Sequence, residues 1–248
     1  MNTPRIRTEN LSKRYKGADK FSLEKVNLSI SSGDIYGILG PNGAGKTTLI
    51  SILCGIFEPT EGSLSYYRNS KAVSFEQFQP NIGYVPQEYA FFEELTPLQN
   101  LEYFGAMYNL NKNEIRSQSR LILDLLGLKK VVNDRILTFS GGMKRRVNLA
   151  IGIIHNPSVL FLDEPTVGVD VQSKVAILRI LKELNQKGTT IIYTSHHLSE
   201  AEAFCNSISL LDHGKIIVEG SLKALMKEHE TQNLKDLFIR FTGEEFRD

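Results

Sequence analysis

Three short stretches of this sequence have residue types and spacing that suit chemistry on phosphate groups. Residues 40–47, GPNGAGKT, follow the pattern G-x-x-x-x-G-K-[ST], which forms a loop whose backbone N–H groups surround phosphate oxygens. In such a loop Lys46 reaches the β and γ phosphates as a point charge, and the Thr47 hydroxyl can bind Mg²⁺. A strand is predicted before the loop and a helix after it, as this motif requires. A structural glycine-rich turn is the alternative.

The second stretch, VLFLDE at 159–164, ends a predicted strand with two acidic residues. Its four apolar residues indicate a strand buried on both faces, and ligands bind at the carboxyl ends of such strands in open α/β sheets. We assign Asp163 to a bound Mg²⁺ and Glu164 to general-base catalysis on an attacking water. Without the phosphate loop, a solvated acidic turn would explain these residues equally well.

The third stretch, Ser140-Gly141-Gly142, runs into a predicted helix at 141–155. The first turn of a helix has N–H groups without intrahelical partners and a positive dipole end, so these residues form a second candidate anion site. One nucleotide should not need two such cradles from one molecule. The sequence therefore poses the question of which molecule's phosphate the second cradle serves.

Composition excludes several classes of protein. The 248 residues include 29 Lys and Arg and 28 Asp and Glu, so the net charge of +1 gives no overall attraction to nucleic acid or to an anionic membrane. Cys54 and Cys205 lie far apart and lack metal-site spacing, which favours a reduced, cytosolic setting with both as buried small residues. The N-terminus has no apolar segment, and the apolar runs are far shorter than the roughly 20 residues of a membrane-spanning helix. We expect the chain neither to enter nor to cross a membrane by itself.

Apolar periodicity and turn residues predict the elements that must position these stretches. Alternating apolar and polar residues indicate antiparallel strands at 6–11 and 23–30. The polar stretch between the turn EPTEGS and a strand at 81–85 has no predicted element. The further predicted elements are strands at 34–39, 159–162, 189–194 and 207–211 and helices at 46–55, 96–106, 114–126, 141–155, 171–187 and 199–205. The later alternation of strand and helix is typical of a parallel α/β sheet.

These elements predict a single domain over residues 1–248. Its α/β core comprises residues 1–87 and 156–220, a helical insertion occupies 88–155, and a helical tail follows at 221–248. We find no internal repeat and no low-complexity segment.

Six motifs in order resemble the ATP-binding cassette of ABC transporters: GPNGAGKTT, YVPQE, SGGM, VLFLDEPT, GVD and TSHH. The resemblance covers nearly the whole chain. It implies an α/β fold built on a phosphate-loop ATPase core, with a mostly parallel sheet, an N-terminal antiparallel β portion and an inserted α-helical subdomain. It also implies ATP hydrolysis with Mg²⁺ as cofactor, coupled to transport. In this family the SGG loop of one subunit caps the ATP held by the other subunit of a head-to-tail dimer, so the second cradle would serve a neighbour's nucleotide.

The resemblance assigns a role to each matching residue. Gln87 would contact the metal or the attacking water, although a lone glutamine after a strand is usually an ordinary loop residue. His196 would bond the γ-phosphate, with His197 as a competitor for that role. Asp170 would link the two sites across the dimer, or cap the helix from 171, or both. Tyr15 would stack on adenine; the alternative is a surface tyrosine. The nucleotide-binding set is Tyr15, Gly40, Pro41, Asn42, Gly43, Ala44, Gly45, Lys46, Thr47, Thr48, Ser140, Gly141, Gly142 and Asp170, and the metal set is Thr47, Gln87 and Asp163.

The sequence departs from the usual family pattern at three places. Met143 replaces the glutamine that commonly follows SGG, and Phe139 replaces the common leucine before the serine, which we interpret as a packing change. The basic residues 144–146 lie at a helix start, where positive charge opposes the dipole, so we expect acidic partners or a nearby phosphate; a solvated basic face is the alternative. SGGMKRR and the tail at 234–248 resemble a subgroup of ATPase subunits that serve exporters of drugs, polysaccharides or lipids.

That subgroup implies two protein partners. One is a separate integral membrane permease, with a groove around residues 91–103 facing it, and the other is a second ATPase subunit, for which a homodimer is preferred to a heterodimer. No nucleic-acid partner is expected, and the chain would lie in the cytoplasm, peripheral on the inner face of the cell membrane. A non-transport ABC ATPase acting on nucleic acid or ribosomes is the alternative. A GTPase or small-molecule kinase would leave SGG and His196 without a role.

Overall fold

The computed structural model describes residues 4–243, and its internal contacts divide the chain into two compact units. One unit combines residues 1–79 with 190–248, and the other comprises residues 80–189. The final part of the predicted tail, 244–248, lies outside the described residues. Within the described part, no helix combines the length and the apolar character needed to cross a bilayer. Cys54 and Cys205 are both buried, as predicted.

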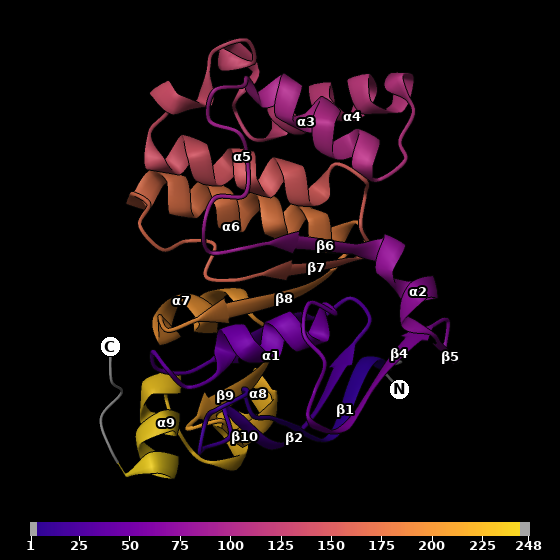
Figure 1. Ribbon diagram of the computed structural model, residues 1–248. Coiled ribbons are helices and arrows are strands. Elements are labelled where there is room, and N and C mark those ends of the chain that lie inside the picture. Colours follow the sequence, from indigo (N-terminus) through magenta and orange to yellow (C-terminus); the bar gives the residue numbers. More distant parts are fainter. Residues whose placement is uncertain (1–3, 244–248) are drawn as a thin grey trace. The chain divides into compact units, whose positions relative to one another are not determined.

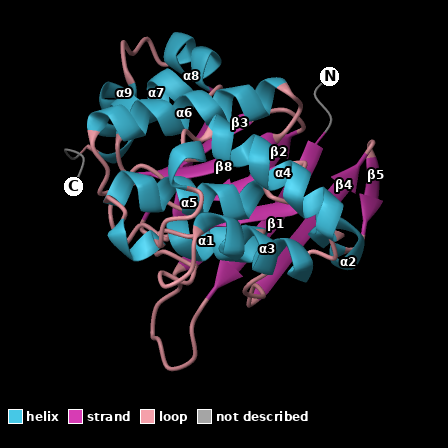
Figure 2. Cartoon of the chain, turned by 90° about the horizontal axis from the view of Figure 1, so that it is seen from above, coloured by secondary structure: helices cyan, strands magenta, loops and turns pink. Residues whose placement is uncertain are grey.

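The unit formed by 1–79 and 190–248 contains two groups of strands. An antiparallel sheet has the order β2-β1-β4-β5, and Figure 2 shows β5 at its edge beside β4. The second group has the order β10-β9-β3-β8, in which β3 pairs in parallel with both β8 and β9. The strands are β1 (Pro4–Lys13), β2 (Leu23–Ser31), β3 (Ile35–Leu39), β4 (Glu61–Arg68), β5 (Lys71–Val73), β8 (Thr190–Ser195), β9 (Ser207–Asp212) and β10 (Lys215–Ser221). The helices are α1 (Lys46–Leu53), α2 (Phe75–Phe78), α7 (Leu198–Phe204), α8 (Leu222–Glu228) and α9 (Leu234–Thr242).

Full burial of β3 and β8 explains why neither sequence alternates regularly between apolar and polar residues. All residues of both strands are buried, and a strand covered on both faces cannot alternate apolar with polar side chains. Helix α1 follows β3 after the phosphate loop and packs against β8. The central strand β3 therefore delivers the loop to the carboxyl end of its neighbours.

The unit formed by 80–189 is mostly helical. Strands β6 (Ile82–Val85) and β7 (Val159–Leu162) pair in parallel. Figure 1 shows α5 lying along α6, and α5 also packs on β6, α3 and α4. The helices of this unit are α3 (Pro97–Met107), α4 (Lys112–Leu125), α5 (Gly141–Ile153) and α6 (Val171–Gln186). It also has 3-10 turns at η2 (Lys129–Val131) and η3 (Ile136–Thr138), and another, η1 (Gln79–Asn81), spans the boundary between residues 79 and 80. Four completely buried residues make β7 the apolar base for the acidic pair that follows it.

The observed elements confirm the predicted fold class and most predicted elements. The prediction that the polar stretch after EPTEGS contains no element was wrong, because β4, β5 and α2 lie there. Strand β10 was not predicted either. In β4 only Tyr66 is buried, so its sequence lacks a strong alternation, and its pairing with β1 is what makes it a strand. Strand β10 is held in the same way by its ladder with β9. The predicted division into core, insertion and tail remains a prediction.

Asn100 fixes the segment that leads into α3. Its side chain is fully buried; its Oδ1 accepts from the Phe92 N–H at 2.9 Å, and its Nδ2 donates to the carbonyls of Phe92 and Thr96 at 3.0 and 3.1 Å. We expect Asn100→Ala to lower the free energy of unfolding by about 2–4 kcal/mol, because buried backbone groups lose their partners. Urea denaturation measures this change. The control Gln99→Ala, which removes an exposed capping-box bond to Thr96, should cost about 1 kcal/mol or less.

Candidate functional site

The phosphate loop wraps its own lysine. Lys46 is only 5% exposed, and its Nζ donates to the carbonyls of Gly40 and Pro41 at 2.9 and 3.1 Å. Those two bonds hold the ammonium inside the curve of the loop at the start of α1. The family of loops with this sequence uses such a lysine to bind terminal phosphates, and the observed position fits that use.

The first turn of α1 provides the backbone donors. Its N-cap is Gly45, with φ of 108°, and no side chain caps the helix among the described residues; the first turn also contains no acidic residue. Four N–H groups at a helix start need acceptors, and an anion supplies them with the help of the helix dipole. A Cβ built on Gly43 meets no atom within 4 Å, and Thr47 is exposed, so the outer side of the loop is open. These observations fit a bound triphosphate.

Tyr15 lies against the start of α1. Its hydroxyl is within hydrogen-bond distance of Thr48 Oγ1, at 3.2 Å, and its ring meets the edge of Phe57 with centroids 6.0 Å apart. The Lys13 ammonium lies 5.7 Å from the Tyr15 ring centroid and 5.8 Å from that of Phe57. Tyr15 remains 39% exposed. An exposed aromatic ring held beside a phosphate loop suits stacking on a base.

The end of β8 brings His196 to the same loop. The Gly40 N–H donates to the Ser195 carbonyl at 3.3 Å, so the residue after Ser195 lies at the beginning of the phosphate loop. His196 is half-buried, whereas His197 is exposed and begins α7. The two rings lie with centroids 4.0 Å apart. This arrangement gives His196, more than His197, a place beside the loop.

The acidic pair and Gln87 gather in the unit formed by 80–189. The Asp163 N–H donates to the Val85 carbonyl at 2.9 Å, which joins the carboxyl ends of β6 and β7 two residues before Gln87. Asp163 is 2% and Glu164 6% exposed. Glu164 has φ of 47°, a left-handed conformation that costs about 1–3 kcal/mol and collects at functional sites. Carboxylate, amide and hydroxyl oxygens are the ligand types that Mg²⁺ prefers, so the predicted metal set fits by its chemistry.

The SGG turn forms the start of α5. Ser140 is its N-cap, with Oγ accepting from the Met143 N–H at 3.3 Å, and both Ser140 and Gly141 are exposed. A Cβ on Gly142 would lie 2.1 Å from Ser173 Oγ, so that position accepts only glycine.

Asp170 acts as the N-cap of α6, one of the two roles predicted for it. Its Oδ1 accepts from the Ser173 N–H at 2.9 Å and its Oδ2 from the Ser173 hydroxyl at 2.7 Å. These hydrogen bonds lower the pKa of the Asp170 carboxyl. Its role across a dimer remains a prediction.

The basic triplet has three different partners. Lys144 pairs with the carboxylate of Glu93 at 2.8 Å, as the expectation of an acidic partner predicted. Arg146 instead donates to the carbonyl of Leu126 at 3.0 Å, and Arg145 donates to backbone carbonyls described below. Arg145 also has the negative charge of Asp163 acting on it, as an acidic partner would, whereas the hydrogen bonds of Arg146 go to the carbonyl oxygens of Leu126 and Gly142.

Sequence reasoning missed Asn148 and Tyr89 and gave Arg145 no specific role. Arg145 and Asn148 contact the segment that contains Gln87, and Tyr89 belongs to that segment and packs on Arg145. The available signal was a pair of polar residues three apart, at 145 and 148, which fall on one face of the predicted helix.

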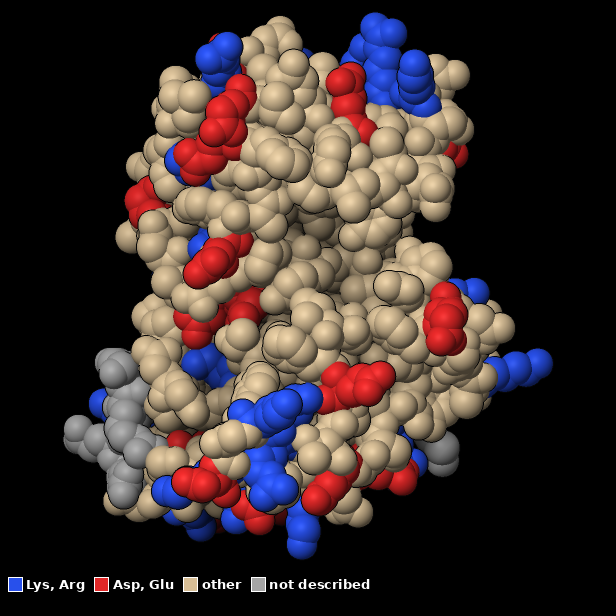
Figure 3. Space-filling model, viewed as in Figure 1, with Lys and Arg blue, Asp and Glu red and all other residues tan. Residues whose placement is uncertain are grey.

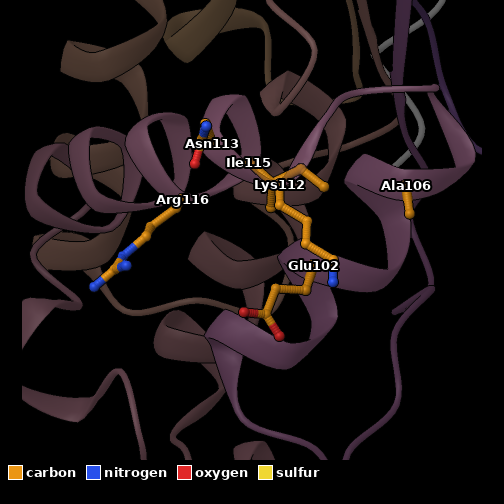
Figure 4. A pocket seen from close by; sticks show the side chains of 6 residues that line it. All are labelled: Glu102, Ala106, Lys112, Asn113, Ile115 and Arg116. Carbon is orange, nitrogen blue, oxygen red and sulfur yellow. The ribbon is translucent and has the colours of Figure 1, made fainter.

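A cavity of about 590 Å³ lies between α3 and α4 (Figure 4). In the figure the Lys112 side chain extends toward the stem of Glu102, whose carboxylate points to the other side, and Arg116 points away. None of the predicted site residues lines this cavity. Each predicted group is instead brought together within its own unit: the phosphate loop, Tyr15 and His196 in one, and Gln87, the acidic pair and the SGG turn in the other.

Comparison with known proteins decides the family. The family model described as ABC transporter matches residues 23–167, more than half of the chain, and includes the phosphate loop, the SGG turn and the acidic pair. The chain belongs to the ABC transporter family. A model described as an AAA domain also matches residues 135–202.

Individual relatives agree with this family. The linearmycin resistance ATP-binding protein LnrL of Bacillus subtilis is 39% identical over 87% of this chain and 69% of the relative. The Nod factor export ATP-binding protein I of Sinorhizobium fredii is 35% identical over 90% of this chain and 64% of the relative. This chain is thus an ATP-binding subunit of an ABC transporter, and it is an ATPase.

Two solved structures extend the likeness to the fold. The ATP-binding subunit of an ABC transporter has a TM-score of 0.84 at 27% identity, covering 96% of this chain and 99% of that one. A dimeric, post-hydrolysis ATP-binding cassette bound to ADP and Pi has a TM-score of 0.77 at 28% identity, covering 88% and 98%. ABC cassettes of this kind dimerise and work with membrane subunits.

Two glycines of the ABC phosphate loop should respond differently to a methyl group. A Cβ on Gly40 would lie 2.1 Å from the Leu211 carbonyl oxygen, a backbone atom of β9 that cannot turn aside. We expect Gly40→Ala to lower the free energy of unfolding by about 1–3 kcal/mol and ATP affinity by about tenfold or more. Gly43→Ala has space, and its positive φ should cost about 1–2 kcal/mol with a smaller loss of affinity. Denaturation and binding of a fluorescent ATP analogue measure both; equal losses of affinity would contradict this account.

Proposed function

We propose that this chain hydrolyses ATP to drive export through a separate membrane permease, working as a head-to-tail pair of ATPase subunits. The observation that carries the proposal is that one chain has two helix starts of a kind suited to an anion, the uncapped α1 and the exposed SGG turn of α5. The linearmycin resistance and Nod factor export relatives support an exporter. The alternative of a non-transport ATPase acting on nucleic acid or ribosomes is not favoured, because these relatives belong to transport systems.

The phosphate loop would bind the triphosphate and Tyr15 the adenine. Residues 40–48 would surround the phosphates with N–H donors, and Lys46 would turn from its loop carbonyls to the β and γ phosphates. Tyr15, supported by the edge of Phe57, would stack on the base. Its contact with Thr48 supports this, because it keeps the ring beside α1.

Hydrolysis would depend on residues that orient one water. Glu164 would accept its proton, His196 would bond the γ-phosphate, and Gln87 would hold the water or the metal. The strained backbone of Glu164 supports a functional role for its carboxylate. Mg²⁺, held by Thr47, Asp163 and Gln87, would supply positive charge that neutralises the phosphate oxygens.

The SGG turn would complete the site of the other subunit. Ser140 accepts a hydrogen bond as the cap of α5 and would donate its hydroxyl hydrogen to a phosphate of the partner's nucleotide. The N–H groups of Gly141 and Gly142 would donate beside it, and Asp170 would link the two sites. Because Met143 replaces the usual glutamine, this site would rely on the serine and backbone donors.

The permease would contact the helical insertion at 88–155, around residues 91–103. Phe92 and Tyr103, which are 44% and 48% exposed, support an apolar contact there.

Basic and acidic side chains are interspersed on the face in Figure 3, in keeping with the small net charge. We propose that the chain resides in the cytoplasm on the inner face of the membrane through this contact, as a homodimer, with core, insertion and tail bounded as predicted from the sequence.

The Glu164→Gln variant tests hydrolysis and dimer closure together. It should keep ATP affinity within about twofold and lose hydrolysis by about 100-fold or more, because the general base is absent. Light scattering should then record a shift from monomer to dimer only when ATP and Mg²⁺ are both added. Turnover near that of the unchanged chain would remove Glu164 from the base role.

Mixed dimers test whether SGG acts on the neighbour's nucleotide. Ser140→Arg and Lys46→Ala subunits should each be inactive alone, yet their mixture contains one composite site with an intact loop and an intact SGG turn. We expect each mixed dimer to recover up to about half of the activity of the unchanged dimer, since one of its two sites is complete. The control is a mixture of two Lys46→Ala preparations. If proven mixed dimers stayed inactive, the assignment of SGG to the neighbour's nucleotide would be lost.

A further inference from the structure

Arg145 occupies an unusual place for an arginine. It lies in the first half of α5, is only 4% exposed, and its Nη1 donates to the carbonyls of Pro86 and Gln87 at 3.2 and 2.8 Å. Burying a guanidinium is unfavourable unless its donors find acceptors. These two carbonyls belong to the segment that follows β6, so the arginine joins the SGG helix to the Gln87 backbone.

Tyr89 closes this connection into a ring of contacts. The guanidinium carbon of Arg145 lies 5.1 Å from the Tyr89 ring centroid, and the Tyr89 hydroxyl donates to the Gly141 carbonyl at 3.2 Å. Arg145 thus connects the helix that begins at the SGG turn to the Gln87 segment, and Tyr89 connects that segment back to the SGG turn. The contacts of Arg145 and of Tyr89 therefore both resist a shift of the SGG turn relative to the Gln87 segment.

Asn148, one turn further along α5, holds the same segment at both ends. Its Nδ2 donates to the Pro86 carbonyl at 3.0 Å, and its Oδ1 accepts from the Ala90 N–H at 3.2 Å. Residues three apart lie on one face of a helix, so Arg145 and Asn148 form a continuous polar face against residues 86–90. This face explains why two polar side chains are buried among the glycine and apolar residues on the buried side of α5.

Asp163 adds an electrostatic connection to the acidic pair. Burial lowers the pKa of the Arg145 guanidinium, and the negative charge of Asp163 and the Tyr89 side chain partly oppose that effect. The charge of Arg145 therefore acts on the carboxylate at the end of β7 as well as on the Gln87 carbonyl.

We infer that Arg145 is a positioning residue that makes the SGG turn and the Gln87 segment move as one body. The inference rests on the proposed function, since the roles of Gln87 and SGG are proposed there. Arg145 itself touches no substrate. Its effect is that a displacement of the SGG turn by a partner's nucleotide reaches Gln87 directly through α5.

Hydrogen exchange tests this connection without relying on activity. In Arg145→Met, which keeps an unbranched apolar stem but removes the donors and the charge, amide exchange across residues 86–90, whose N–H groups are those of 87–90, should accelerate by about tenfold or more. Exchange in β3 and α1 should stay unchanged. The matched control is Arg146→Met on the same helix, because its partners, the carbonyls of Leu126 and Gly142, both lie outside residues 86–90.

Kinetics provide the second readout. Arg145→Met should lower kcat by about tenfold and change the KM for ATP by less than about twofold, because misplacing a reacting group affects the rate more than binding. Arg145→Lys keeps the positive charge but places its donors on one nitrogen, so its kcat should lie between those of Arg145→Met and the unchanged chain. If Arg145→Met fails to fold, Tyr89→Phe, which breaks only the bond to Gly141, should accelerate exchange across 86–90 to a smaller extent.

The outcomes separate this inference from the proposed function. Unchanged exchange across 86–90 in both Arg145→Met and Tyr89→Phe would overturn the inference. Equal acceleration in Arg146→Met would also overturn it, because any loss of charge on α5 would then suffice. Accelerated exchange with unchanged kcat would support the positioning role and contradict the proposed role of Gln87 in hydrolysis.

Discussion

Backbone N–H groups at helix starts need acceptors, and the chemistry of this chain depends on how two helices meet that need. In α1 the N-cap is Gly45, which has no side chain to offer, so the first turn can accept a phosphate. In α3, α4 and α6 a Thr, Asn or Asp side chain takes that place. The absence of a cap at α1 therefore follows from a local choice of residue, and it leaves the first turn available to the anion that the proposed function places there.

Helix α5 has a side-chain cap and also an exposed first turn. Ser140 caps the helix as an acceptor, while the exposed turn still presents the serine and Gly141 outward. The buried side of the same turn is occupied by Ser173, which leaves no space for a Cβ on Gly142. A turn that packs on one side and presents donors on the other suits recognition of a second molecule's phosphate.

Positive charge near the start of α5 opposes the helix dipole, and the structure compensates it with specific partners. Lys144 has the Glu93 carboxylate, and Arg145 has two carbonyls and the field of Asp163. Each partner lies on a segment that the proposed mechanism uses or adjoins. Positive charge at this position destabilises the helix through its dipole, and the hydrogen bonds and ion pair to other segments offset that cost.

The sequence by itself determined the phosphate loop, the apolar strand before Asp163, the cap before α6 and the α/β class, because each follows from local residue types and spacing. The role of Asn148 and the partners of Arg145 and Arg146 were decided only in the tertiary structure. Strand β10 is not in that group, because it pairs with β9 across the turn at 213–214, whereas β4 belongs to it, since its partner β1 is distant in sequence. The physical reason is the same in each case: a hydrogen bond between residues far apart leaves no periodic signal in either segment, whereas a cap, a glycine loop or a buried strand is encoded within a few consecutive residues.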